Sequence, residues 1–234
     1  MGKKVAVVIP SYNSKRWIGK LTTEVLKVLP SSMVYVVDDN SPDKTAESVT
    51  EKFGKNLRVK LIVRTGKGGR GSAVLAGFKE ALKEKENELF VEMDSDFAHD
   101  PADLPALVEK CIEFDVAAAS RYLPGGKVVN MPWQRYLFSR AAMFWSRLVL
   151  GIPLSDQTAF RCYSRRALES LNFDKIKSRG FFVITEMAFQ LFKKGFSFGE
   201  VPVTVTYTAP EVSNFSLKEI KEAFFSVIKL KLGP

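Results

Sequence analysis

The sequence is poor in the residues that build disulfide frameworks and structural zinc sites. Its 234 residues include only two cysteines, Cys111 and Cys162, and a single histidine, His99. The two cysteines are far apart and match no metal-binding or redox spacing, so we expect reduced, buried thiols in an intracellular protein. The composition therefore predicts neither a disulfide-stapled secreted domain nor a Cys/His zinc site.

Long apolar runs are missing as well. Near the N-terminus charged residues return after a short apolar run, so no signal peptide is predicted. No apolar run reaches the roughly 18 residues that a membrane-spanning helix needs. With 46% hydrophobic residues the chain can still bury a core, and its net charge of +9 indicates anionic partners. Nucleotide phosphates, nucleic acid and anionic lipid all fit that charge.

Apolar strands and amphipathic helices alternate through the first half of the chain. The predicted strands span residues 5–10, 33–37, 57–63, 89–93 and 115–120, and the predicted helices span about 17–29, 43–53, 72–85 and 102–113. This alternation predicts an α/β fold with a mainly parallel central sheet between layers of helices. In such sheets ligands bind beyond the carboxyl ends of the strands.

The second half has a different pattern. Residues 131–150 form one or two basic amphipathic helices with several aromatic side chains, and residues 216–232 form another. Two explanations remain open for residues 131–150: a core helix whose arginines reach out to water, or a helix that lies in a membrane interface. A helix is also expected over 181–194, and the alternation over 197–207 predicts an antiparallel or edge strand.

Two carboxylates, Asp94 and Asp96, end the fourth predicted strand. Side chains at i and i+2 of an extended segment point to the same side, so both can face one ion. Such hard oxygen donors suit Mg²⁺ or Mn²⁺, with substrate phosphates completing the coordination. Alone, the pair is equally typical of a solvated turn before Pro101. Further polar clusters at Tyr12–Asn13 and Asp38–Asp39 follow the first two strands and favour a ligand site at this edge.

A second phosphate-binding pattern competes with this interpretation. Residues 66–71 match G-x-G-x-x-G between a strand and a helix, and Glu92 follows about 20 residues later, as in dinucleotide-binding oxidoreductases. The motif follows the third strand, however, whereas the dinucleotide fingerprint normally follows the first. Lys67 and Arg70 make it a basic loop. We therefore expect a loop that faces an anion or a plain surface turn.

Seven short motifs together carry a family resemblance. In chain order they are Ile9–Asn13, Val37–Asp43, Gly71–Gly77, Met93–Pro101, Ser120–Tyr122, Asp156–Arg161 and Gly199–Val203. The set resembles the family 2 glycosyltransferases of GT-A fold, and within them it is similar to dolichol-phosphate mannose synthases. The resemblance covers about residues 5–215. It implies one domain over 1–234, with a nucleotide-binding half to about 122 and an acceptor- and membrane-facing half from about 123.

The resemblance also implies roles for individual residues. The residues implied to bind the nucleotide are Pro10, Tyr12, Asn13, Val37, Asp39, Ser95 and Asp96. Asp94 and Asp96 are implied to bind the metal, and Asp94, Asp96 and Arg121 to take part in catalysis. Arg135 and Ser139 are implied to bind the acceptor phosphate. The implied reaction transfers a sugar, mannose first among the candidates, from GDP-mannose or a UDP-sugar to a polyprenyl or dolichyl phosphate, with inversion and with Mg²⁺ or Mn²⁺.

The implied setting is the cytoplasmic face of a membrane, with the protein bound peripherally and without nucleic acid as a partner. A membrane-anchoring partner protein, or a membrane segment beyond the given C-terminus, stays open. Two other functions also stay open: a related transferase with a soluble or protein-linked sugar acceptor, and a catalytically weak protein that binds nucleotide or membrane. A sugar hydroxyl as acceptor would need a general base, for which His99, Asp156 and Glu186 are candidates. A phosphate acceptor would not.

The sequence departs from the family pattern at several positions. Ser14 stands where the family usually has glutamate. Near the C-terminus Thr208 and Asn214 replace an expected arginine and lysine, and Glu211 replaces a glycine, although Ser213 is kept. Two cations expected at the donor phosphates are thus absent from their usual positions. Candidate replacements are Lys67, Arg70 and Lys218.

Overall fold

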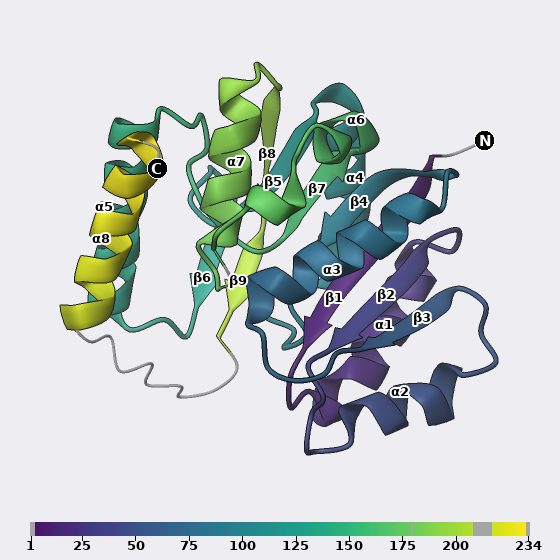
Figure 1. Cartoon of the computed structure of the whole chain (residues 1–234). Helices are drawn as coiled ribbons and strands as arrows, with labels where there is room; N and C mark the ends of the chain where they lie inside the picture. Colours follow the sequence, from purple (N-terminus) through teal and green to yellow (C-terminus); the bar gives the residue numbers. More distant parts are fainter. Residues whose placement is uncertain (1–2, 179, 208–216, 233–234) are drawn as a thin grey trace.

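The computed structural model describes residues 3–178, 180–207 and 217–232, and for residues 217–223 it describes the backbone alone. The described residues form a seven-stranded sheet in the order β3-β2-β1-β4-β7-β5-β8 (Figure 1) and a small sheet of β6 and β9. The strands are β1 (Lys4–Ser11), β2 (Met33–Asp38), β3 (Val59–Val63), β4 (Asn87–Glu92), β5 (Val116–Ser120), β6 (Lys127–Val129), β7 (Arg161–Ser164), β8 (Phe198–Pro202) and β9 (Thr204–Thr206).

The mainly parallel sheet predicted from the sequence is confirmed. β1 pairs in parallel with β2 and β4, β2 with β3, and β5 with β8. The exception is β7, which lies antiparallel between β4 and β5. Because β7 runs against its neighbours, the segment that precedes it arrives at the same edge as the carboxyl ends of the parallel strands.

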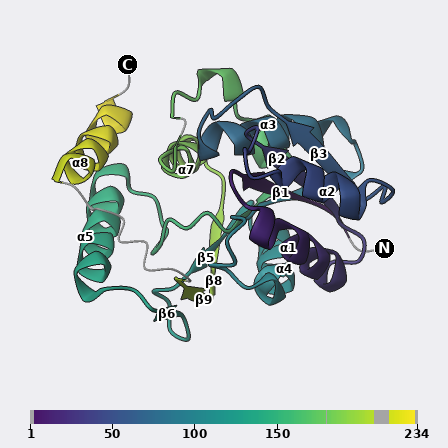
Figure 2. The ribbon, with the colours of Figure 1, turned by 90° about the horizontal axis from the view of Figure 1, so that it is seen from below.

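Helices cover both faces of the sheet (Figure 2). They are α1 (Lys15–Val28), α2 (Thr45–Phe53), α3 (Arg70–Lys83), α4 (Leu104–Glu113), α5 (Trp133–Leu150), α6 (Arg165–Glu169), α7 (Val183–Lys193) and α8 (Leu217–Leu232), with 3-10 turns η1 (Pro101–Asp103) and η2 (Phe173–Lys175). One core cluster joins α1, α2 and α4 to the sheet, and a second joins α3, α6 and α7 to the opposite face. The expected helix–sheet–helix layering is therefore present.

The second half differs from the prediction at several places. Residues 133–150 form one continuous helix. The segment 197–207 is not a single antiparallel strand: it forms β8, a parallel edge strand, and then β9 in the small sheet. The chain changes sheet around Val203, whose N–H donates to Ser120 while its carbonyl accepts from Lys127. The short elements β6, β7 and α6 were not predicted, because three to five residues show no usable periodicity.

Helices α5 and α8 pack against each other beside the sheet (Figures 1 and 2). The rings of Trp145 and Phe224 stack at 4.3 Å between centroids. Ser146 and Leu150 are the residues of α5 that are buried, so the interpretation of this helix as a core helix is wrong for most of its length. Within the described ranges, no helix combines the length and apolar character that crossing a bilayer requires.

Candidate active site

The sheet collects its polar residues at one edge. Ser11 and Asp38 end β1 and β2 side by side in register. Glu92 ends β4 and Ser120 ends β5, and both strands run in the same direction as β1. The edge therefore brings together side chains from distant parts of the sequence, as expected for the ligand-binding edge of such a sheet.

Residues predicted to bind the nucleotide lie at the ends of β1 and β2. Pro10 and Val37 are register partners, and both are buried. The Val37 side chain belongs to the core below α3, so only its backbone can face a ligand. Tyr12 is 39% exposed, and the Lys67 ammonium lies 4.4 Å from its ring centroid. Asn13 takes a left-handed backbone with φ of 56°. Tyr12 thus presents an accessible ring beside a basic loop.

Asp39 contacts the glycine-rich loop, whereas its neighbour Asp38 is buried and contacts the turn after β2. The Asp39 carboxylate accepts the backbone N–H of Gly68 at 2.9 Å and lies 3.2 Å from the Arg64 guanidinium. Asp38 is fully buried and accepts the N–H and hydroxyl of Ser41 at 2.8 and 2.6 Å. Asp38 therefore stabilises the turn after β2, and Asp39 is the candidate that borders the site.

Ser95, between the two predicted metal ligands, contacts the start of α1. Its hydroxyl lies 2.7 Å from that of Ser14, the residue at the N-cap of α1. The backbone N–H of Ser14 donates to the Thr45 hydroxyl at 3.0 Å. At the position where a glutamate was expected, this chain thus has a neutral hydroxyl that joins the start of α1 to the loop of Asp94 and Asp96.

Arg70 is the unexpected partner of Asp94. Its Nε donates to Asp94 at 2.6 Å and its Nη2 to Glu92 at 3.0 Å. Burial alone would lower the pKa of Arg70, but Asp94 and Glu92 raise it above its ordinary value. The hydroxyl of Tyr163 also donates to Glu92, at 2.8 Å. Two guanidinium nitrogens of Arg70 therefore bind carboxylates at and after the end of β4, and its use as a substitute phosphate-binding cation stays a prediction.

The donor set at the end of β4 fits a divalent cation. The Arg70 hydrogen bond uses only one oxygen of Asp94, and two carboxylates share that one guanidinium, so negative charge remains. One oxygen of Asp96 accepts the N–H of Ala98 at 2.9 Å. The described residues contain no group of three or more His, Cys, Asp or Glu that could hold a metal ion. A cation here would need substrate oxygens, as Mg²⁺ and Mn²⁺ sites with few protein ligands do.

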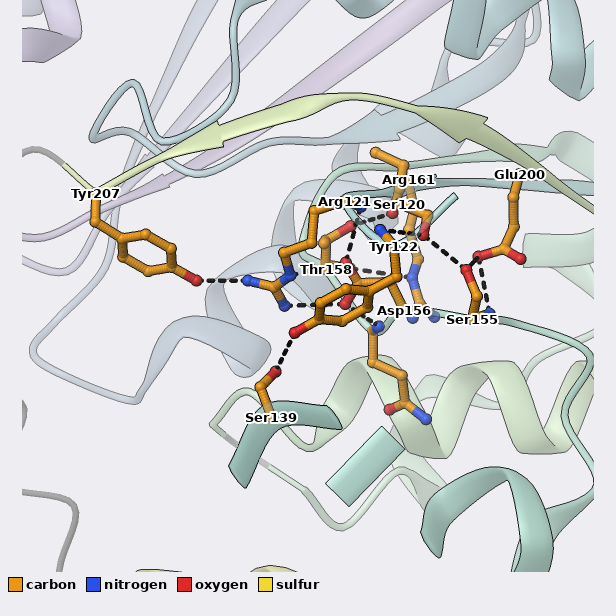
Figure 3. Close-up of polar contacts among 12 residues, drawn as sticks. Ser120, Arg121, Tyr122, Ser139, Ser155, Asp156, Thr158, Arg161, Glu200 and Tyr207 are labelled. Atoms are coloured by element: carbon orange, nitrogen blue, oxygen red, sulfur yellow. Dashed lines mark hydrogen bonds and ion pairs between the residues drawn. The ribbon is translucent and has the colours of Figure 1, made fainter. Parts of the chain in front are cut away.

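Arg121 lies in a buried ion pair with Asp156 (Figure 3). Asp156 accepts the Nε and Nη2 of Arg121 at 2.9 Å each and its backbone N–H at 3.1 Å. Burial alone would lower the pKa of Arg121, and the Asp156 charge raises it above its usual value. The remaining nitrogen, Nη1, donates to the Tyr207 hydroxyl. Asp156 thus orients a permanently charged fork at the end of β5.

The two residues predicted to bind the acceptor phosphate, Arg135 and Ser139, lie on helix α5. The Arg135 guanidinium carbon lies 4.6 Å from the Tyr207 ring centroid. Ser139 accepts the hydroxyl of Tyr122 at 2.8 Å, and the Arg140 guanidinium carbon lies 4.9 Å from the Tyr122 ring. Arg121 contacts both tyrosines, since Tyr207 accepts its hydrogen bond and its guanidinium carbon lies 5.1 Å from the Tyr122 ring centroid, so they join Arg121 to this face of α5.

Tyr207 was not among the predicted site residues. The signal available in the sequence was its place at the end of the alternating segment 197–207. An aromatic residue at a strand end is too common to indicate a site by itself. Only the pairing of β9 with β6 shows that this strand end lies beside Arg121.

Strand β9 joins the loop that carries Asp94 and Asp96 to the part of the site around Arg121. The Thr206 N–H donates to the Ala98 carbonyl at 2.9 Å, and His99 forms a bridge with Val205. His99 is 6% exposed and packs on Phe160. Burial lowers the pKa of its imidazole to about 4, against the opposing effect of Asp94. The ring is therefore neutral at pH 7 and, with that pKa, a weak general base.

The remaining candidates lie elsewhere or have structural partners. Glu186 accepts the N–H groups of Lys177 and Ser178 at 3.2 and 3.0 Å, so it stabilises the turn before α7.

A Cβ on Gly71 would lie 2.5 Å from the Gly180 carbonyl oxygen, so this glycine is required for close packing. Outside the described residues lie Thr208, Glu211, Ser213, Asn214 and the side chain of Lys218.

Comparisons of the sequence with known proteins found a matching family model and similar relatives. The model of glycosyl transferase family 2 matches residues 6–171. The polyprenol monophosphomannose synthase of Mycolicibacterium smegmatis is 37% identical over 228 residues, which cover 96% of this chain and 86% of that protein. The undecaprenyl-phosphate mannosyltransferase of Micrococcus luteus is 34% identical, covering 98% and 95%. The dolichol-phosphate mannosyltransferase of Pyrococcus furiosus is 35% identical, covering 97% of this chain and 63% of that protein.

Solved structures show the same fold at much lower identity. A glucosyl-3-phosphoglycerate synthase from Mycobacterium tuberculosis, in complex with Mn²⁺, UDP and glucosyl-3-phosphoglycerate, matches with a TM-score of 0.72. It is 17% identical, and the match covers 98% of this chain and 80% of that one. This likeness confirms the expected GT-A architecture and extends no further than the fold.

Proposed function

Because the chain belongs to glycosyltransferase family 2, we propose that it transfers mannose from a nucleotide diphospho-sugar to a polyprenyl phosphate. The three relatives of 34–37% identity, whose names specify mannose and a polyprenyl carrier, support this choice of sugar and acceptor. GDP-mannose is the donor we expect, and a UDP-sugar is the alternative donor.

The observation that carries the proposal is a pair of arginines without carboxylate partners. Among the described residues, Arg135 and Arg140 make no ion pair, and their guanidinium groups lie over the rings of Tyr207 and Tyr122. Arg121 has Asp156, but the α5 arginines have no such compensation. We propose that a substrate anion pairs with these two arginines, and a lipid phosphate beside the Ser139 hydroxyl would supply that anion.

On the donor side, the chain's own residues bind and orient the nucleotide sugar. The Tyr12 ring and the Asp39 carboxylate border the place where base and ribose would lie, and Lys67 lies beside them. Asp94 and Asp96 would hold Mg²⁺ or Mn²⁺, which supplies positive charge to the diphosphate leaving group. Arg121, held by Asp156, adds a fixed cation close to the departing phosphate or the sugar.

On the acceptor side, the chain needs to position an anion rather than remove a proton. A polyprenyl monophosphate is already ionised near neutral pH, so its oxygen can attack the anomeric carbon directly. Inversion in a single displacement follows from attack opposite the leaving diphosphate. The weakly basic, buried His99 is consistent with a mechanism that requires no strong general base.

The α5–α8 pair is the surface that we propose to rest on the membrane. Its exposed apolar residues include Trp133, Leu137, Phe138, Phe144, Leu148, Phe225 and Leu232. Lys229 and Lys231 in the last turn of α8 add positive charge for anionic lipid. Such a surface would place Arg135 and Ser139 close to a lipid-borne phosphate. The protein would then act as a peripheral protein at the cytoplasmic face.

Replacing Phe144 and Leu148 with serine should weaken binding to anionic vesicles about tenfold or more, because each apolar side chain contributes about 1.5–3 kcal/mol when fully buried. Co-sedimentation with vesicles measures the change. Leu57→Ser is the matched control, since Leu57 is 91% exposed and lies in the turn before β3, away from α5. Equal binding by the double variant and the wild type would contradict the proposed membrane surface.

The reaction itself is tested with a panel of labelled donors and acceptors in the presence of Mn²⁺. We expect mannose transfer from GDP-mannose to a polyprenyl phosphate, at least about a hundredfold faster than transfer to free sugars or glycopeptides. Preferred transfer from a UDP-sugar would revise the donor alone. Preferred transfer to a sugar hydroxyl, or nucleotide binding without any transfer, would replace the proposed function.

A further inference from the structure

Tyr207 lies between two arginines that belong to different parts of the site. Its hydroxyl accepts the Nη1 of Arg121, at the end of β5. Its ring faces the guanidinium of Arg135, on α5, at 4.6 Å from the ring centroid. A single phenol therefore contacts the cation proposed for the leaving group and the cation proposed for the acceptor.

The position of the Tyr207 ring is fixed by its backbone and by the core. The Tyr207 N–H donates to the Val129 carbonyl of β6 at 3.1 Å, and its side chain packs against the core cluster beneath α1 and α4. One residue earlier, Thr206 is bonded to Ala98 in the loop that carries Asp96. The backbone beside Tyr207 is therefore hydrogen-bonded to the loop that carries Asp96, and the Tyr207 side chain contacts both arginines.

Two guanidinium groups on one small side chain would normally repel each other. Arg121 offsets its charge with Asp156, while Arg135 makes no ion pair within the described residues. A phenol can attract both cations at once, because its oxygen accepts a hydrogen bond and its ring face carries negative potential. A carboxylate in this place would neutralise Arg135 and compete with a substrate phosphate.

We propose that Tyr207 is a positioning residue that sets the spacing between Arg121 and Arg135 and leaves Arg135 uncompensated for the acceptor phosphate. This role rests on the proposed function of the site. The hydroxyl orients Arg121 towards the leaving diphosphate, and the ring face orients Arg135 towards the attacking phosphate. Tyr207 itself need not touch either substrate.

Two substitutions separate the hydroxyl from the ring. Tyr207→Phe removes the bond to Arg121 and keeps the aromatic face for Arg135; Tyr207→Leu removes both. For Tyr207→Phe we expect kcat to fall about tenfold with the acceptor KM within about twofold of wild type. For Tyr207→Leu we expect a similar fall in kcat and, in addition, an acceptor KM raised about fivefold. Steady-state kinetics with varied polyprenyl phosphate measures both parameters.

Tyr35→Phe is the matched control, because it removes a phenol hydroxyl bonded to Asn87 at the start of β4, at the opposite edge of the sheet. Melting temperatures and GDP binding are measured for all variants. The inference is overturned if Tyr207→Phe keeps wild-type kcat, if Tyr207→Leu leaves the acceptor KM unchanged, or if Tyr35→Phe reproduces either effect. Absence of mannose transfer by the wild type would instead overturn the proposed function, so the two failures are distinguishable.

Discussion

Replacing Asp96 with asparagine is expected to lower kcat for sugar transfer about a thousandfold, equivalent to about 4 kcal/mol of transition-state stabilisation. Asp94 and Asp96 are the carboxylates that we propose to hold the cation just after the end of β4. Removing one charge weakens the cation's attachment where the leaving diphosphate develops its negative charge. Single-turnover transfer with a labelled donor measures the loss of rate.

The same variant has a readout that does not depend on transfer. In the presence of Mn²⁺, GDP should raise the melting temperature of the wild type and leave that of Asp96→Asn nearly unchanged. Asp100→Asn is the matched control in the same loop, because Asp100 caps η1 by accepting the Ala102 N–H at 2.9 Å. Asparagine caps a helical turn as well as aspartate does. If the nucleotide stabilised Asp96→Asn as much as wild type, the metal-bridged binding mode would be wrong.

Replacing Arg121 with glutamine is expected to lower kcat about a hundredfold or more and also to destabilise the fold. The loss of rate follows from removing a fixed cation from the leaving group. The loss of stability follows because Asp156 is fully buried and would lose the guanidinium that pairs with it. Breaking a buried pair in this way costs about 3–5 kcal/mol. Kinetics and denaturant unfolding measure the two effects separately.

A double variant separates the structural role of Arg121 from its catalytic role. Arg121→Gln combined with Asp156→Asn removes both charges, so much of the lost stability should return while kcat stays low. Arg147→Gln, at an exposed arginine near the end of α5, controls for a change in net charge. If the double variant recovered activity together with stability, the ion pair would be structural only and Arg121 would have no part in the reaction.

The end of β4 shows which features of the site could be predicted from the sequence alone and which could not. The apolar run before Asp94 was sufficient to predict that both carboxylates follow a strand, because an apolar run is a local pattern. The strand ends at Glu92 and Asp96 lies in a turn, so the i, i+2 spacing of an extended strand does not apply to the pair. The partner of Asp94 was not predictable in the same way. Arg70 lies 24 residues earlier, at the first position of α3 and beside glycines that suggested a different motif, and its contact with Asp94 depends on how α3 packs against β4.

The sequence by itself determined the alternation of strands and helices, the parallel sheet and the edge at which its polar residues gather. These features follow from local periodicity and from the direction that parallel strands share. Only the tertiary structure decided the partners of Arg121. The reversed strand β7 brings Asp156 to that edge from 35 residues away, and the small sheet of β6 and β9 brings Tyr207 from 86 residues away. Contacts between such short, distant segments arise from packing, which no local pattern of residues encodes.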